Sequence, residues 1–312
     1  MRLIISSMII PKLIIDTDPG HDDVMAILLA VKSGLFDIKA ITTVAGNSVL
    51  ENATKNACFT LDLLDRRDIP VYSGQPKPLK RELILAVVHG ESGLDGVDTS
   101  KTKFDLTYDA EDRIIELVQK NPGITLLTLG PLSNIARALI KNPKIEENIK
   151  QIVMMGGAIN VPGNKNRVGE FNFVVDPDAA DVVFKTNIKK ILVPIDICND
   201  MLIPQEAFEA LNGNSLYKPV MDMMKKFIDG IEKFEGVRGA LIYDAVAAYY
   251  LINPKAFKRE EMDIAIETQG EHTFGMTVVE RRKWVKHNNN VSVALKVNKK
   301  QFMNDFFKYL NH

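Results

Sequence analysis

Short apolar runs rich in β-branched residues alternate with stretches of helical period along most of the chain. The runs predict strands at residues 12–16, 38–46, 69–74, 124–130, 151–157 and 189–196. Because a helical stretch separates most successive runs, the pattern is typical of an α/β protein. We expect a mostly parallel, Rossmann-like open sheet with helices on both of its faces.

The predicted helices follow these strands. In the first helix, apolar residues recur at the spacing of one helical face, and Gly34 marks its end; they are Val24, Ile27, Leu28 and Val31. Further helices are expected at residues 50–65, 110–120, 131–141 and 301–310. Residues 203–252 have a mainly helical pattern, which predicts a helical insertion near the C-terminal third.

No repeat, linker or low-complexity tract interrupts the chain, so we expect a single domain over residues 1–312. Residues 1–11 precede the first strand and are expected to be a disordered or mis-started N-terminal extension, with Met8 as a candidate start. Residues 75–108 form one long segment rich in Pro, Gly and charge. Loops of this length inside a compact domain are usually functional or disordered.

The overall charge limits which classes of binding partner are expected. Lys and Arg total 39 against 40 for Asp and Glu, a formal charge of -1, so no basic surplus points to nucleic acid or to an anionic membrane. No later apolar run approaches the roughly 20 residues that a membrane span needs. Two cysteines, Cys58 and Cys198, are too few for a disulfide scaffold and are expected to be buried. We therefore expect a cytoplasmic protein with a small neutral substrate.

The run DTDPGHDD, residues 16–23, places four carboxylates at the junction of the first strand and the first helix. Like charges so close repel one another, so a fold keeps such a cluster mainly when a cation neutralises it. Oxygen ligands favour calcium or magnesium over zinc. Asp22 and Asp23 project about 100° apart on a helix, so one can bind the metal while the other faces the substrate.

Two other interpretations of this run exist. Capping of a helix N-terminus accounts for one or two aspartates, but not for four around Pro19 and Gly20. An Asp-x-Asp pair after a first strand also resembles the haloacid-dehalogenase phosphatases, in which Asp16 would be the nucleophile of a metal-dependent phosphatase. That scheme leaves Asp22 and Asp23 unexplained.

The same run resembles the amino-terminal signature of the inosine-uridine-preferring nucleoside hydrolases. Similar blocks follow in the family's order at residues 45–47, 89–96, 129–136, 154–164, 169–180 and 243–250. The resemblance implies an enzyme that hydrolyses the N-glycosidic bond of ribonucleosides, with purine or pyrimidine preference open. It also implies a homo-oligomer, either a dimer or a tetramer.

Carried over by position, the resemblance implies a Ca²⁺ held by Asp18, Asp23 and Asp244, with the backbone carbonyl of Leu129 as a further ligand. Asp22 matches the general base. The positions that match residues around the ribose or the attacking water are Asn47, Asn164, Glu170 and Asn172, and Met155 and Asp244 are counted with them as substrate-binding.

The positions of these residues agree with the predicted sheet. Asn47, Leu129 and Met155 each lie at or just after the end of a predicted strand, so they would meet at its carboxyl edge, where open α/β folds bind ligands. Taken alone, each asparagine is more often a turn residue. Alternation in a strand at residues 169–173 would point Glu170 and Asn172 to one face.

One position departs from the family. The residue before Asp244 is usually His, placed to protonate a purine leaving group, but here it is Tyr243. Tyrosine is a weaker acid at neutral pH, so it either donates a hydrogen bond to the base, stacks on it, or is simply a partly buried residue at the start of a helix. A non-catalytic nucleoside- or ribose-binding protein is therefore an alternative.

Two further residues are open. His89 matches the family's pattern near the pocket, and an exposed loop histidine is the alternative. Trp284, the only tryptophan, is interpreted as a surface or interface residue rather than as a base-stacking one. The Met-rich stretch at residues 220–230 is expected to belong to the core or to a subunit interface.

Overall fold

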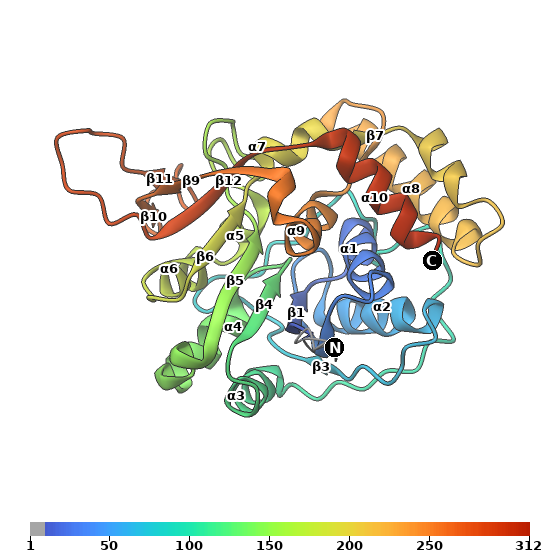
Figure 1. The fold of residues 1–312 in the computed structure, drawn as a ribbon, viewed down its shortest axis with the longest axis horizontal. Coiled ribbons are helices and arrows are strands. Elements are labelled where there is room, and N and C mark those ends of the chain that lie inside the picture. The colour runs from blue at the N-terminus through green and yellow to red at the C-terminus, as the bar shows by residue number, and fades with distance from the viewer. Residues whose placement is uncertain (1–9) are drawn as a thin grey trace, which may run out of the picture.

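The structure is a computed structural model that describes residues 10–312. The predictions for residues 1–9 and for a start at Met8 lie outside this range. Eight strands form one sheet in the order β3-β2-β1-β4-β5-β6-β12-β9 (Figure 1). Their bounds, in that order, are Val71–Ser73, Asp37–Thr43, Lys12–Thr17, Ile124–Thr128, Ile149–Met155, Lys190–Val193, Val291–Val297 and Phe257–Met262. All neighbours pair in parallel except β12 and β9, which confirms the predicted mostly parallel α/β sheet.

Helices cover both faces of the sheet. Leu13 and Ile15 of β1 contribute to one apolar core, and Ile14 between them contributes to the other, as strand alternation requires. The first core also holds residues of α1 (His21–Lys32), α2 (Leu50–Leu63), α8 (Tyr217–Glu235), α9 (Tyr243–Ile252) and α10 (Lys299–Leu310). The second core holds residues of α3 (Ala110–Lys120), α4 (Ser133–Lys141) and α6 (Pro177–Phe184).

Helix α1 lies inside the molecule rather than on its surface. The sequence predicts one apolar face, but every residue from His21 to Val31 is buried. The chain packs other helices around α1, with α9 making its most extensive contact. The expectation of an amphipathic helix was therefore wrong, and the aspartates at the start of α1 lie in a buried environment.

The strand order reverses direction between β1 and β4. Strands β2 and β3 follow one another on one side of β1, and β4, β5 and β6 follow on the other. Open α/β sheets bind ligands in the crevice that this reversal leaves at the carboxyl ends of the strands. The run after β1 and Leu129 after β4 both lie at this crevice.

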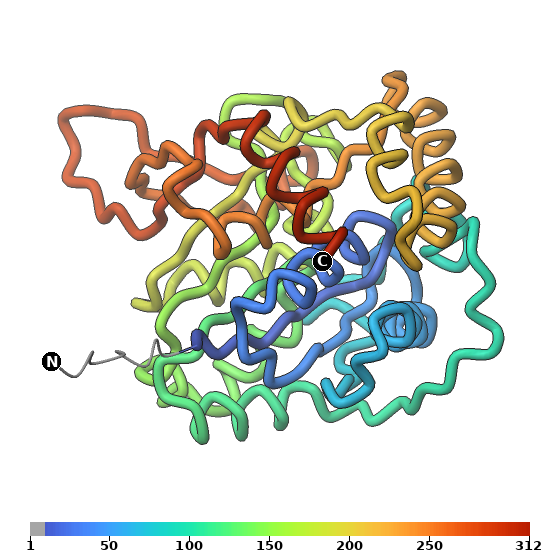
Figure 2. Tube along the Cα trace, turned by 45° about the vertical axis from the view of Figure 1, so that its right-hand side comes forward, coloured from blue at the N-terminus to red at the C-terminus, as the bar shows by residue number. Residues whose placement is uncertain are grey.

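The remaining segments agree with most sequence expectations. Residues 74–109 contain no helix or strand, and the later part of this segment, which leads to α3, runs along the outside of the molecule (Figure 2). Residues 203–252 are mainly helical, with short strands β7 (Leu202–Ile203) and β8 (Ala240–Leu241) beside α8. In the described part, no helix combines the length and apolar character needed to cross a membrane.

A small hairpin lies between β9 and β12 in the chain. Strands β10 (Ile264–Ile266) and β11 (Thr277–Val279) pair antiparallel, and the segment around them projects from the body of the molecule (Figure 1). Trp284 follows this hairpin and is 82% exposed, which agrees with the predicted surface position.

Candidate active site

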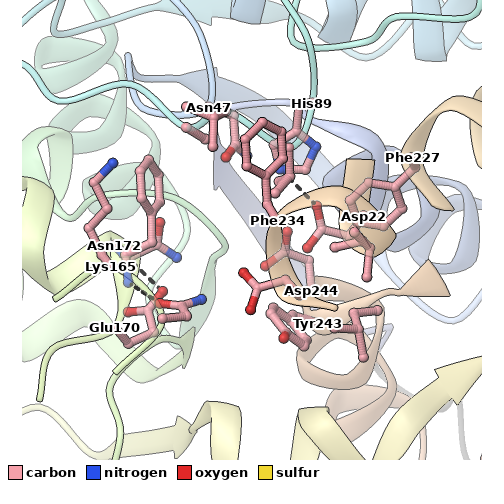
Figure 3. A pocket seen from close by; sticks show the side chains of 18 of the residues that line it. Asp22, Asn47, His89, Lys165, Glu170, Asn172, Phe227, Phe234, Tyr243 and Asp244 are labelled. Carbon is pink, nitrogen blue, oxygen red and sulfur yellow. Dashed lines mark hydrogen bonds and ion pairs between the residues drawn. The ribbon is translucent and has the colours of Figure 1, made fainter. Parts of the chain in front are cut away.

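A cavity of about 290 Å³ opens at the carboxyl edge of the sheet (Figure 3). Polar and apolar side chains share its wall. The lining residues are Asp22, Asn47, Ala86, Val87, Val88, His89, Met155, Asn164, Lys165, Glu170, Phe171, Asn172, Phe227, Ile231, Phe234, Glu235, Leu241, Tyr243 and Asp244. Every residue predicted to bind substrate therefore lies in one cavity, although these residues come from six different parts of the chain.

Three aspartates meet at one place in this cavity. Asp22 and Asp23 begin α1, and Asp244 is the second residue of α9, so two helix starts converge. One carboxylate oxygen from each lies within 4.8 Å of the others, a spacing that a single cation can bridge. All three are buried.

The burial and the unpartnered oxygens of the aspartates favour binding of a cation. One oxygen each of Asp18, Asp22 and Asp244 is buried without a hydrogen-bond partner. Burial, and then the charge of Asp23, raise the pKa of all three carboxyl groups well above the usual value. Such oxygens are costly unless they are protonated or bound to a cation, and oxygen ligands suit a hard divalent ion. The residues present therefore fit a hard divalent cation, the class to which calcium belongs.

Asp18 lies beside the three aspartates, in a space made by two glycines. Its Oδ2 accepts a hydrogen bond from the backbone N–H of Asn47 at 2.6 Å, and its Oδ1 is free of partners. A Cβ added to Gly46 or to Gly130 would come within 2.1 Å or 2.4 Å of the Asp18 carboxylate. These loops after β2 and β4 must therefore carry glycine for the carboxylate to reach the site.

Asp23 is the most completely hydrogen-bonded member. Thr17 Oγ1 donates to its Oδ1, and its Oδ2 accepts from the backbone N–H of Gly20 at 3.0 Å and from Asn47 Nδ2 at 2.9 Å. Asp23 therefore caps its own helix and also holds Asn47 in the cavity. The capping interpretation is correct for Asp23, but it leaves the free oxygens of the other aspartates unexplained.

Glu170 and Asn172 form the opposite wall, but not on the predicted strand. Residues Phe171–Val175 are the short helix α5, and Glu170 is its N-cap, accepting from the N–H groups of Asn172 and Phe173. The expected strand alternation was therefore wrong. Both side chains still face the cavity, because one caps the helix and the other lies in its first turn (Figure 3). Burial raises the pKa of Glu170 to about 7.

Asn172 links this wall to two strand ends. Its Nδ2 donates to the carbonyl of Leu129 at 2.7 Å and to that of Met155 at 3.3 Å. Asn164 Oδ1 accepts from the N–H of Phe171 at 2.9 Å, which anchors the preceding loop. The carbonyl of Leu129 keeps a second lone pair, so its predicted role as a metal ligand stays a proposal.

His89 is buried, so the alternative of an exposed loop histidine was wrong. Its ring stacks with those of His21 and Phe227 at centroid distances of 5.4 Å and 5.2 Å. Its Nε2 lies 3.8 Å from Asp22 Oδ1, and its Nδ1 lies 3.1 Å from His21 Nδ1. Burial lowers the pKa of both histidines, that of His21 to about 4, so both rings are neutral at pH 7.

Tyr243 lines the cavity and is half-buried at the start of α9. Its hydroxyl donates to Asn199 Oδ1 at 2.8 Å, and burial raises the pKa of Tyr243 above its usual value. The hydroxyl is therefore a hydrogen-bonding group at neutral pH rather than a ready proton donor.

Sequence reasoning missed the part of α8 that faces the cavity. Phe227, Ile231, Phe234 and Glu235 line it, whereas Met223 and Met224 of the same helix are buried in the core. The prediction that residues 220–230 belong to the core is confirmed for Met223, Met224 and Phe227, and Phe227 also lines the cavity. Phe227, Ile231 and Phe234 continue the apolar face of α8 toward its C-terminal end, but nothing local shows that this end borders a ligand site.

The two cysteines and Asp16 lie elsewhere. Cys58 and Cys198 are buried free thiols, as expected. Asp16 is fully buried in β1, where its Oδ2 accepts from Thr42 Oγ1 at 2.5 Å and from Asn134 Nδ2 at 2.8 Å. It does not line the cavity, so it is not placed to attack a phosphate ester. The phosphatase interpretation was wrong.

Asp16 gives a prediction about pH. Burial raises its pKa from 3.8 to about 7, so the folded state holds a proton that the unfolded state has already lost. This contribution to stability is therefore lost as the pH rises from about 4 to 7. Between pH 5 and 7.5 the wild type should lose up to about 3 kcal/mol relative to Asp16→Asn, as measured by urea unfolding. Equal losses in both proteins would contradict this assignment.

Known proteins resemble the chain over almost its whole length. Residues 13–304 match the family model described as inosine-uridine preferring nucleoside hydrolase. A pyrimidine-specific ribonucleoside hydrolase RihA from Shewanella woodyi is 39% identical over 297 residues, covering 93% of this chain and 95% of the relative. The protein of the same name from Escherichia coli is 37% identical over 302 residues, with the same coverage.

Solved structures give the same result for the fold. A plant nucleoside hydrolase superposes with a TM-score of 0.90 at 30% identity, covering 97% of this chain and 99% of that one. A purine-preferring ribonucleoside hydrolase from Gardnerella vaginalis superposes with a TM-score of 0.87 at 28% identity, covering 96% and 98%.

Proposed function

Because the chain belongs to the inosine-uridine preferring nucleoside hydrolase family, we propose that the cavity hydrolyses pyrimidine ribonucleosides to free base and ribose with the help of a calcium ion. The family membership makes the chain a nucleoside hydrolase, and the choice of base and ion is our proposal. Pyrimidine preference follows the relatives from Shewanella woodyi and Escherichia coli, which bear that specificity in their names.

One observation carries the proposal: buried carboxylate oxygens without partners converge in a cavity whose other wall carries a carboxylate and amides. Asp18, Asp23 and Asp244 would hold the ion, together with the carbonyl of Leu129. When bound, the ion would lower the pKa of a water molecule, keep the surrounding carboxylates ionised and orient the ribose hydroxyls.

Asp22 is the residue that takes the proton. It lines the cavity, and its Oδ1 has no hydrogen-bond partner, so this oxygen is free to accept one from water. Its position beside Asp23 lets one aspartate hold the ion while its neighbour faces the substrate. The proton of the attacking water passes to Asp22 as the new C–O bond forms at the sugar.

Glu170, Asn172, Asn164 and Asn47 fix the ribose. Their side chains line the same cavity as the acidic cluster, and preorganised dipoles of this kind would stabilise the positive charge that the sugar gains as the glycosidic bond lengthens. Because Glu170 and Asn172 are held by the backbone of α5 and by strand ends, they need little rearrangement during the reaction.

His89 and Tyr243 face the opposite part of the cavity and serve the leaving base. His89 lies close to Asp22, and Tyr243 lies next to Asp244 in the chain. A pyrimidine leaves as an anion or a neutral tautomer, and a hydrogen bond from the neutral ring of His89 would stabilise it without full proton transfer, whereas the O–H of Tyr243 is already donated to Asn199 Oδ1. The missing family histidine is therefore compatible with catalysis.

The proposal is tested by measuring the free base and reducing sugar released from uridine, cytidine, inosine, adenosine and 2′-deoxyuridine. A bound ion would contact the ribose hydroxyls in the proposed mode, so deoxyuridine should react at least about 100-fold more slowly than uridine, as for loss of a charge-assisted contact. Comparable rates for the two would overturn the ribose contact. Binding of nucleosides without any turnover would instead identify a non-catalytic binding protein.

A further inference from the structure

We infer that Glu235 is a specificity-determining residue that binds the outer edge of the nucleobase and favours bases with an amino group there. The inference rests on the proposed function. Glu235 belongs neither to the acidic cluster nor to the wall formed by Glu170 and Asn172. Its proposed role concerns the choice between bases rather than the reaction itself.

Helix α8 runs from the buried end of the cavity to its opening. Phe227, Ile231, Phe234 and Glu235 recur at a spacing that places them on one side of the helix, and all four line the cavity. Phe227 is 1% exposed and Phe234 is 48% exposed, so the helix rises from the interior to the rim. Glu235 is its last residue and is exposed at that rim.

The cavity has a buried polar end and an apolar surface that reaches its rim. Asp22, Asp244 and Asn172 are buried, and Phe227, Ile231 and Phe234 of α8 add apolar and aromatic surface from the interior to the rim (Figure 3). A ribose needs the buried polar groups for its hydroxyls, and a flat base stacks best on aromatic surface. With the sugar held at the acidic cluster, the outer edge of the base points toward the rim.

Glu235 is available for a ligand. Within residues 10–312 no group hydrogen-bonds or ion-pairs with the Glu235 carboxyl group. Arg238, three residues away, is instead paired with Glu232. Glu235 and Tyr243 both line the cavity, and partial burial raises the pKa of Glu235.

An ionised carboxyl group accepts hydrogen bonds and donates none. At the outer edge, cytosine and adenine carry an amino group, which donates, whereas uracil and hypoxanthine carry a carbonyl oxygen, which accepts. A carboxylate at this place attracts the amino group and repels the carbonyl oxygen. Glu235 should therefore favour cytidine over uridine and, among purines, adenosine over inosine.

The test compares wild type, Glu235→Gln and the matched control Glu232→Gln, which removes one charge from the solvent side of the same helix. An amide both donates and accepts, so Glu235→Gln should lower the ratio of kcat/KM for cytidine to that for uridine by about tenfold. Glu232→Gln should leave the ratio within about twofold of wild type, the range of a surface change. Thermal unfolding of each variant confirms that it is folded.

Three results would overturn the inference: an unchanged ratio in Glu235→Gln, an equal change in Glu232→Gln, or a higher ratio in Glu235→Gln. If the wild type hydrolyses no nucleoside, the proposed function fails instead. Competition by free cytosine and free uracil gives a second measurement, because binding of cytosine should weaken more than that of uracil in Glu235→Gln.

Discussion

The Asp22→Asn variant is expected to lose about 10³-fold in kcat with little change in KM, the range found for removal of a general base. Asparagine has nearly the same size and keeps a hydrogen-bonding oxygen, but it cannot take a proton from water. Asp22 Oδ1 is buried without a partner, so replacing this atom breaks no hydrogen bond of the folded protein. The variant should therefore fold as the wild type does.

The control separates catalysis from helix stabilisation. Asp112 lies in the first turn of α3, as Asp22 does in α1, but it is on the surface and pairs with Lys141. Asp112→Asn removes the same favourable charge from a helix start, so its turnover should match the wild type. If Asp22→Asn kept more than about a tenth of the wild-type kcat, Asp22 would not be the base.

Removal of calcium with EGTA should lower turnover by at least about 100-fold, because the acidic cluster then repels itself and water is no longer activated. Added calcium should restore turnover. It should also stabilise the fold by mass action, by about 2.7 kcal/mol at 100 times the dissociation constant. Thermal unfolding reports this stabilisation without any substrate.

Asp244→Asn provides the matched comparison for the ion. Asp244 comes from α9, more than 200 residues after the other aspartates, so its loss should weaken calcium binding without changing the run at residues 16–23. Its melting temperature should rise less with calcium than that of the wild type. Full activity in EGTA, or equal calcium shifts in both proteins, would remove the ion from the mechanism.

The local pattern of the chain determined the class of fold and the location of the chemistry. Strands and helices follow hydrophobic period, which is a property of neighbouring residues, and parallel strands bring their carboxyl ends to one edge. The run at residues 16–23 and the residues Asn47, Leu129 and Met155 could therefore be assigned to one edge before any contact was known. The four carboxylates also pointed to a cation through their repulsion alone.

Only the tertiary structure decided how these groups are arranged. Asp22 and Asp23 meet Asp244, while Asp18 lies between glycines beside them, because α9 packs against α1. The same packing buries every side of α1, which its sequence pattern does not predict. His89 is buried for a similar reason, since its neighbours come from distant parts of the chain.

The wall formed by Glu170 shows where local reasoning failed. Residues 169–173 satisfy a strand pattern, but the cap at Glu170 supplies acceptors to the next N–H groups and starts a helix there. The cavity face of α8 and the position of Glu235 at the rim could not be predicted from the sequence either. A ligand site is formed by residues that come together only in the folded chain. The sequence by itself determined which chemistry the protein carries, and long-range packing decided which side chains face it.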